Sequence, residues 1–343
     1  MSAPKTSGLK SILLRHETIL LLVLIAEWLF FYFTGTTTKR GQTFGFGSLD
    51  SQFDILRHSA EIGLLALVMT PVILTGGIDL SVGSTLGLCA NLFGKLWHDA
   101  GLAPWLAALI TIGLGGCAGL LNATLITALR LPPLIVTLGT FSLFRGLGEA
   151  ITRGTITYTG FPQSFLDLGQ SRLAGLPTQV WIFLAVTICV WVLVHRTTFG
   201  RSFRAIGFAA EGARYAGLPV QRRTAFVYVL AGLVAGLAAV IYTARLGQAK
   251  ADAGTGYELF AITAVVLGGT SIFGGAGSVH GTLLGVAAIA VLTNGLVQIG
   301  KPREVAGMLT GALLLLALSA GTLPRLLASR KPRALSPTPN PTT

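Results

Sequence analysis

Long apolar segments dominate this chain and decide what it can fold into. A helix needs about 20 mainly apolar residues to cross the hydrocarbon core of a membrane. Only 11% of the 343 residues are charged, whereas soluble domains carry about 25%. The sequence therefore predicts an all-α integral membrane protein. Ten transmembrane helices are expected, over residues 17–34, 58–77, 81–98, 104–128, 132–151, 178–195, 224–243, 258–273, 277–298 and 304–323.

The basic residues indicate the orientation of these helices. The loop 196–223 carries six arginines and one glutamate, and short loops rich in Lys and Arg stay in the cytoplasm. Since ten crossings return the chain to its starting side, both termini are expected in the cytoplasm. They form an N-terminal segment 1–16 and a Pro-rich, disordered tail 324–343, around a single transmembrane domain 17–323. Basic loops, rather than nucleic-acid binding, explain the excess of 25 Lys and Arg over 13 Asp and Glu.

Two glycine-rich stretches interrupt the helical pattern at the depth of the membrane. They are TGGIDLSVGS at 75–84 and LGGTSIFGGAGSVHG at 267–281, either distant repeats or unrelated turns. Each glycine lowers helix propensity by about 1 kcal/mol relative to alanine. Irregular backbone survives in a bilayer only where protein covers it or where it lines a watery cavity. We expect two broken or reentrant segments on a translocation path, formed by Gly76, Gly77, Asp79, Ser81, Ser84, Gly268, Gly269, Thr270, Ser271, Gly274 and Gly275.

Asp79 is the acidic residue of the first stretch. Burying a carboxylate costs several kcal/mol unless it meets water or a partner. We expect it to cap the N-terminus of the following half-helix by accepting hydrogen bonds from the amides around Val82 and Gly83. Direct contact with a transported solute is the alternative.

The basic loop contains a short amphipathic segment, RAIGFAAEGARYAGLPV at 204–220. Small and apolar residues alternate with Glu211 and Arg214, and Gly217 followed by Pro219 gives a normal helix stop. One short cytoplasmic helix is expected. Its small residues suit close packing against another protein, whereas a solvated anchor would also explain the charge.

Four sequence blocks occur in a characteristic order: GGIDLSVGS (76–84), NATLITALRLPPLIVTLGTFSLFRG (122–146), TTFGRSFRAIGFAAEGARYAGLPV (197–220) and GTGYELFAITAVVLGGTSIFGGAGSVHGTLLG (254–285). With them the sequence resembles the permease subunits of ATP-binding-cassette (ABC) sugar importers of the ribose, xylose and rhamnose class. The resemblance implies the larger, type II-like ABC importer fold and translocation of a monosaccharide or related small polyol-like solute. Autoinducer-2 import is an alternative within the same class.

The resemblance also implies partners and a location. An ATP-binding subunit, often with two ATPase domains in one chain, would dock on the inside, and a periplasmic solute-binding protein would deliver solute from outside. A second permease copy or a paralogue would complete the pathway in the bacterial inner membrane. The third block carries the family's coupling helix, which implies an ATPase coupling surface formed by Gly207, Glu211, Ala213, Arg214 and Gly217. The chain departs from the family pattern at Phe208, Ala209 and Ala276.

The sequence lacks the nucleotide-binding and catalytic motifs that an ATPase or a hydrolase would need. It contains no G-x-x-x-x-G-K-[ST] phosphate loop, so ATP is expected on the partner subunit and no cofactor on this chain. The histidines never fall in H-E-x-x-H spacing and no G-x-S-x-G elbow occurs, so an enzyme is not expected. An ion-coupled secondary transporter would suit the broken helices, but the four blocks favour the ABC permease.

Two further predictions concern polar residues inside apolar segments. Arg145 and Glu149 lie four residues apart, which predicts an ion pair along one helix face; contact with the docked binding protein is the alternative. His280 is expected to be held by hydrogen bonds rather than to bind solute.

Overall fold

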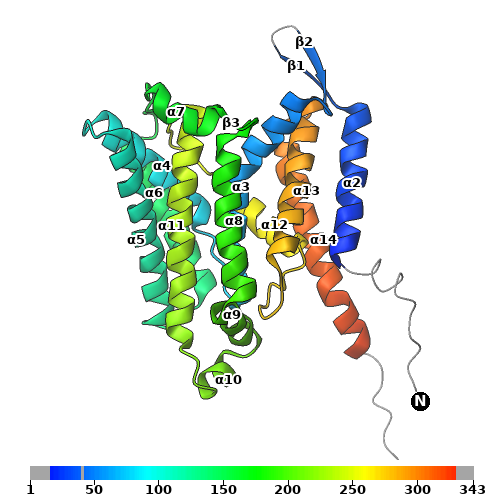
Figure 1. Ribbon diagram of the computed structural model, residues 1–343. Coiled ribbons are helices and arrows are strands. Elements are labelled where there is room, and N and C mark those ends of the chain that lie inside the picture. Colours follow the sequence, from blue (N-terminus) through cyan, green and yellow to red (C-terminus); the bar gives the residue numbers. More distant parts are fainter. Residues whose placement is uncertain (1–15, 40–41, 330–343) are drawn as a thin grey trace, which may run out of the picture.

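The computed structural model describes residues 16–39 and 42–329 and shows a bundle of helices (Figure 1). Each expected span corresponds to one helix. Seven of these, α2, α3, α5, α6, α8, α11 and α13, are long and apolar enough to cross a membrane. The ten helices are α2 (His16–Thr34), α3 (Leu49–Leu74), α4 (Val82–His98), α5 (Pro104–Thr127), α6 (Pro133–Thr152), α8 (Thr178–Arg196), α11 (Val220–Leu246), α12 (Tyr257–Leu267), α13 (Val279–Gln298) and α14 (Arg303–Ser329).

Short elements occupy the two ends of the bundle. At one end lie helix α7 (Gln163–Gln170) and two antiparallel hairpins, and at the other lie helices α9 (Thr198–Phe208) and α10 (Ala210–Tyr215) (Figure 1). The chain ends of α2 and α14 that lead to the two termini point toward the α9 and α10 end (Figure 1). The hairpins are β1 (Thr36–Lys39) with β2 (Gln42–Gly45), and β3 (Arg172–Leu173) with β4 (Leu176–Pro177).

Several expected boundaries need correction. Helix α3 begins at Leu49, well before the expected span 58–77, and α12 ends at Leu267, well before the end expected at 273. The segment 204–220 is not one helix, because the extended backbone of Ala209 (φ −159°, ψ 94°) separates α9 from α10. Helix α14 continues to Ser329, so the first six residues assigned to the tail 324–343 are helical. The rest of that tail, and the segment 1–16 except His16, lie outside the described residues.

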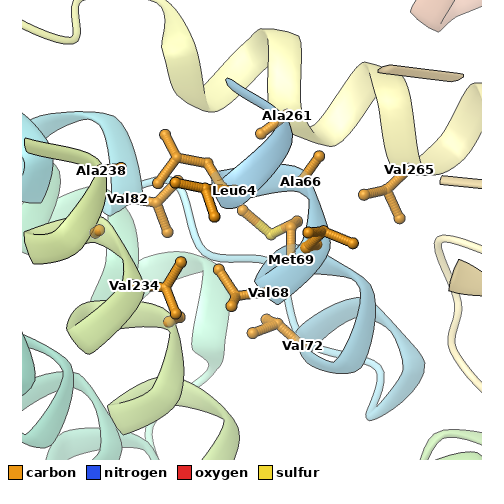
Figure 2. Packing of buried hydrophobic residues seen from close by; sticks show 14 of the residues in the cluster. Leu64, Ala66, Val68, Met69, Val72, Val82, Val234, Ala238, Ala261 and Val265 are labelled. Atoms are coloured by element: carbon orange, nitrogen blue, oxygen red, sulfur yellow. The ribbon is translucent and has the colours of Figure 1, made fainter. Parts of the chain in front are cut away.

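Helix α3 forms the centre of the bundle. Every residue from Gly63 to Leu74 is buried, and a helix that is apolar on all sides is stable only when it is surrounded. Figure 2 shows α3 side chains such as Leu64, Val68 and Met69 packed among residues of α4, α11 and α12. By contrast, α2 buries only Leu20 and Phe31, as expected of a peripheral helix that faces lipid.

Helices α5 and α11 approach each other through glycines. Each carries a G-x-x-x-G pattern, Gly115 to Gly119 on α5 and Gly232 to Gly236 on α11. A Cβ atom on Gly232 would collide with the carbonyl oxygen of Gly115, and one on Gly236 would lie 2.9 Å from the Cα of Ile112. Because lipid is as apolar as leucine, such close backbone packing replaces the hydrophobic effect as the force between helices.

Candidate translocation and coupling site

Three stretches of backbone meet at the α9 end of the bundle: the break between α3 and α4, the break between α12 and α13, and the last turn of α9. The amide of Gly275 donates a hydrogen bond to the carbonyl oxygen of Leu74 over 3.0 Å. A Cβ atom at Gly274 would lie 2.8 Å from the nitrogen of Gly76 and 2.9 Å from the Cα of Gly207. Any side chain would force these stretches apart. We call Gly76, Gly207, Gly274 and Gly275 the glycine junction.

A chain of buried hydrogen bonds fixes the first break against α5 and α6. The Oδ1 atom of Asp79 accepts from the amide and the hydroxyl of Ser81, at 2.8 and 2.6 Å. The Ser81 hydroxyl oxygen accepts from Asn122 Nδ2 at 2.8 Å, and Asn122 Oδ1 accepts from the Thr140 hydroxyl at 2.7 Å. All four side chains are at most 4% exposed. Asn122 and Thr140 were not singled out from the sequence, although a polar residue in an apolar span is the signal that marks them.

Asp79 does not act quite as expected. Its carboxylate accepts a hydrogen bond from the amide of Ser81, whereas the sequence predicted hydrogen bonds from the amides around Val82 and Gly83. The Ser81 side chain makes no capping hydrogen bond to α4. The bond from residue i+2 back to the side chain of residue i forms an Asx turn, which shapes the break rather than the helix end. On its other side the break is covered by Tyr228, because a Cβ atom on Gly77 would collide with the Tyr228 hydroxyl.

The second break is anchored by α2 and α8. The Ser278 hydroxyl caps α13 by accepting from the amide of Gly281 at 3.0 Å and donates to Glu17 Oε1 at 2.9 Å. His280 accepts from Trp191 Nε1 over 2.9 Å, which confirms that it is held by a hydrogen bond. Thr270 is 2% exposed whereas Phe273 is 66% exposed, so only part of this break is packed inside the bundle.

The structure divides the five expected coupling residues into two groups. Glu211, Arg214 and Gly217 are exposed. Ala213 is only 5% exposed, and Gly207 lies in the glycine junction, so both face the bundle instead of a partner. Two aromatic residues near the ends of α10 are each 88% exposed: Phe208, marked in the sequence only as a departure from the family pattern, and Tyr215, which was not singled out from the sequence.

The charged residues inside the helices find partners far away in the sequence. Arg145 Nη1 donates to the carbonyl oxygen of Ala253 over 2.7 Å, and no ion pair with Glu149 occurs among the described residues. Arg145 therefore ties α6 to the loop before α12, so the expected local pair is wrong. Arg245 of α11 donates to Glu61 Oε1 of α3 over 2.7 Å, and the two side chains are 8% and 0% exposed. This buried ion pair joins the central helix to α11.

A cavity of about 580 Å³ lies between α3, α12 and α13, in the half of the bundle remote from α9. None of the eleven residues expected on the translocation path is among its described lining residues. These eleven residues belong to the breaks between α3 and α4 and between α12 and α13, which lie at the opposite end of these helices. The lining consists of Asp54, His58, Ser59, Ile62, Thr255, Tyr257, Phe260, Val286, Ile289, Ala290, Thr293, Asn294, Val297, Gln298 and Ala306.

Comparison with known protein families decides what kind of protein carries this site. Residues 51–318 match the family described as "Branched-chain amino acid transport system / permease component". This match spans both breaks, the glycine junction and the α9–α10 segment. The chain belongs to this permease family. The protein is a multi-pass transport subunit of the inner membrane rather than an enzyme, and together with the relatives described next this match confirms the resemblance to ABC-type sugar permeases.

Individual relatives of this permease are autoinducer-2 transport proteins. The chain is 41% identical over 262 residues to the "Autoinducer 2 import system permease protein LsrD" of Yersinia enterocolitica, covering 75% of this chain and 79% of the relative. The proteins of the same name from Yersinia pseudotuberculosis and Photorhabdus luminescens are 40% identical, covering 75% of this chain and 78% of each relative.

Proposed function

We propose that this chain is the membrane-spanning subunit of a binding-protein-dependent importer for a small polyhydroxylated solute, energised by a partner ATPase. The observation that carries the proposal is the 40–41% identity to autoinducer-2 import permeases over three quarters of the chain. Autoinducer-2 is therefore the first solute to test, and ribose, xylose and rhamnose follow.

All ten helices α2, α3, α4, α5, α6, α8, α11, α12, α13 and α14 cross the membrane in this proposal, with residues 17–323 as one domain. The short helices α4 and α12 are acceptable as spanning elements because each is continued by a break that neighbouring helices cover. Both termini lie in the cytoplasm. Figure 1 supports this arrangement, since the chain ends of α2 and α14 point to the same end as α9 and α10.

The exposed face of α10 is the docking surface for the ATPase, with Phe208, Glu211, Arg214, Tyr215 and Gly217. Exposed aromatic and arginine side chains are those most enriched in the centres of protein interfaces. The partner is an ATP-binding subunit with tandem ATPase domains, and a second copy of this chain or a paralogue completes the pore. Tyr215→Ala should reduce the ATPase that co-purifies, whereas Phe33→Ala, at an 80% exposed position of α2, should not.

The glycine junction links docking to transport. Movement of α10 pulls on α9, and α9 touches both breaks through backbone atoms, so a rigid-body shift reaches α3 and α12 together. The eleven break residues then form the inner end of the translocation path, where a change in their packing opens or closes it. The permease supplies this geometry and the ATPase supplies the energy.

Uptake into proteoliposomes tests the proposal. The permease is reconstituted with its partner ATPase and solute-binding protein, and uptake of labelled autoinducer-2, ribose, xylose and rhamnose is followed with and without ATP inside the vesicles. We expect uptake of at least one of these solutes that requires ATP and the binding protein and stops with vanadate. Uptake that follows a proton or sodium gradient without ATP would overturn the proposal.

A further inference from the structure

A small pocket lies where α11 begins beside the end of α5, at the α9 and α10 end of the bundle (Figure 1). Gln221 Nε2 donates to the carbonyl oxygen of Thr127 at 3.2 Å, which holds the first turn of α11 against α5. The pocket has a volume of about 340 Å³, and its wall includes Arg130, Arg214 and Arg222. The other described lining residues are uncharged, so the pocket is suited to an anion.

The three arginine side chains of this pocket are available to a ligand. All three are exposed, and none makes a hydrogen bond or an ion pair with another described residue. Glu211, the acid nearest to Arg214 in the sequence, does not line the pocket. A guanidinium group presents two parallel N–H donors to phosphate oxygens, which makes arginine the residue best suited to that group.

The first turn of α11 adds backbone donors to the same pocket. The amides of Val220 and Arg223 donate to backbone carbonyl oxygens at 2.8 and 3.0 Å. The amides of Gln221 and Arg222, which both line the pocket, have no acceptor among the described residues. Helix α11 also begins without a side-chain cap and without an acidic residue in its first turn. Free amides at a helix N-terminus favour an anion, so backbone and side chains favour the same ligand.

The surface beside the pocket is apolar and faces away from the bundle. Leu129, Leu134 and Ile135 are each at least half exposed, and they lie on both sides of Arg130 in the chain, in the α5–α6 connection and the first turn of α6. Exposed apolar surface next to charged groups marks a site for a membrane or another protein. A phospholipid would use both features, with its phosphate at the arginines and its acyl chains along α6. A free phosphate ion would use only the arginines.

We propose that this pocket binds the phosphate headgroup of an anionic phospholipid of the cytoplasmic leaflet. Basic pockets between membrane helices on the cytoplasmic side suit such headgroups, and the anionic lipids of that leaflet attract Lys and Arg. The site goes beyond the proposed transport function, because lipid binding requires neither solute nor ATPase. The bound phosphate lies between the α5–α6 connection and α10, and it joins the docking helix to the membrane-spanning helices.

Native mass spectrometry of the full-length permease in detergent tests the site. The protein is titrated with dioleoylphosphatidylglycerol, and with zwitterionic dioleoylphosphatidylcholine, which has the same chains. Arg130 has a φ of 55°, which glycine adopts without strain, so Arg130→Gly removes the guanidinium group and keeps the backbone. We expect wild type to prefer phosphatidylglycerol. Arg130→Gly should bind it about fivefold more weakly, the effect expected of one basic residue near an anionic membrane surface.

Arg153 provides a matched control. It follows the end of α6 with nearly the same backbone conformation, φ 49°, and it lies at the opposite end of that helix from Arg130 and is not among the described lining residues of the pocket. Arg153→Gly should therefore bind phosphatidylglycerol as tightly as wild type. Arg222→Gln, at an exposed position of α11, should repeat the loss seen with Arg130→Gly, and it serves if that variant folds poorly.

Three outcomes would overturn the proposal. Equal affinity for phosphatidylglycerol in wild type, Arg130→Gly and Arg222→Gln would show that the lipid binds elsewhere. Displacement of the lipid by an equal concentration of inorganic phosphate would make the pocket a site for a soluble anion. Unchanged lipid affinity in the two variants, together with less ATPase co-purifying with them, would assign the arginines to the ATPase interface.

Discussion

At the scale of single residues, Asp79 shows how one buried acid shapes the backbone. Asn keeps the Oδ1 acceptor that binds the amide and hydroxyl of Ser81, whereas Ala removes it and leaves a buried donor unsatisfied at a cost of about 1–3 kcal/mol. Asp79→Asn should therefore remain close to wild type in thermal stability and uptake, and Asp79→Ala should lose both. A well-expressed Asn variant without transport would show that the charge contacts solute or a partner.

The ion pair between Glu61 and Arg245 is a second test at this scale. Removing one partner leaves the other charge buried, which destabilises by about 3–5 kcal/mol, whereas replacing both with apolar residues is often neutral. Arg245→Met should lower the unfolding temperature in detergent, and the double variant Glu61→Leu with Arg245→Met should recover most of the loss. The double-mutant cycle would contradict this interpretation if the two changes were additive.

At the scale of helices, the glycine contact between α5 and α11 can be tested with a control on the same helix. Gly119→Leu would place a side chain against the backbone of Tyr228 and Val229, so the helices must separate and the yield of folded protein should fall sharply. At Gly113 an added Cβ atom meets nothing within 4 Å, so Gly113→Leu should fold normally. Size-exclusion chromatography in detergent compares the two variants. Equal profiles for Gly119→Leu and Gly113→Leu would contradict a close backbone contact between α5 and α11.

The same scale shows what could be predicted from the sequence. Each apolar stretch located a helix, seven of them long and apolar enough to cross a membrane, and clustered glycines marked the places where α3 and α12 end, because each of these signals is local. Packing partners could not be predicted. Glu61 and Arg245 are 184 residues apart, and apolar residues that face lipid look the same as those that face other helices. The cavity could not be predicted for the same reason: its wall is formed by residues of α3, α12 and α13, and no local sequence pattern indicates it.

At the scale of the whole molecule, Gly207 is where docking and translocation meet. Alanine favours a helix by about 1 kcal/mol over glycine, so Gly207→Ala should not weaken α9 itself. Its Cβ atom would instead press on the carbonyl oxygen of Leu74 and the nitrogen of Gly275, pushing α9 away from both breaks. We expect the complex to assemble and hydrolyse ATP while uptake falls about tenfold, within the range by which packed residues modulate coupling.

The control for this last prediction lies in α10. At Gly212 the nearest atom to an added Cβ is the Cβ of Ala209 at 3.6 Å, an ordinary contact, so Gly212→Ala gains the same helix propensity without touching the junction. ATP hydrolysis and solute uptake are measured in the same proteoliposomes for both variants, and their ratio reports coupling. Only Gly207→Ala should lower that ratio. If the two variants had equal ratios, distorting the glycine junction would not change coupling. Movement of the ATPase would then reach the two breaks by a route other than α9.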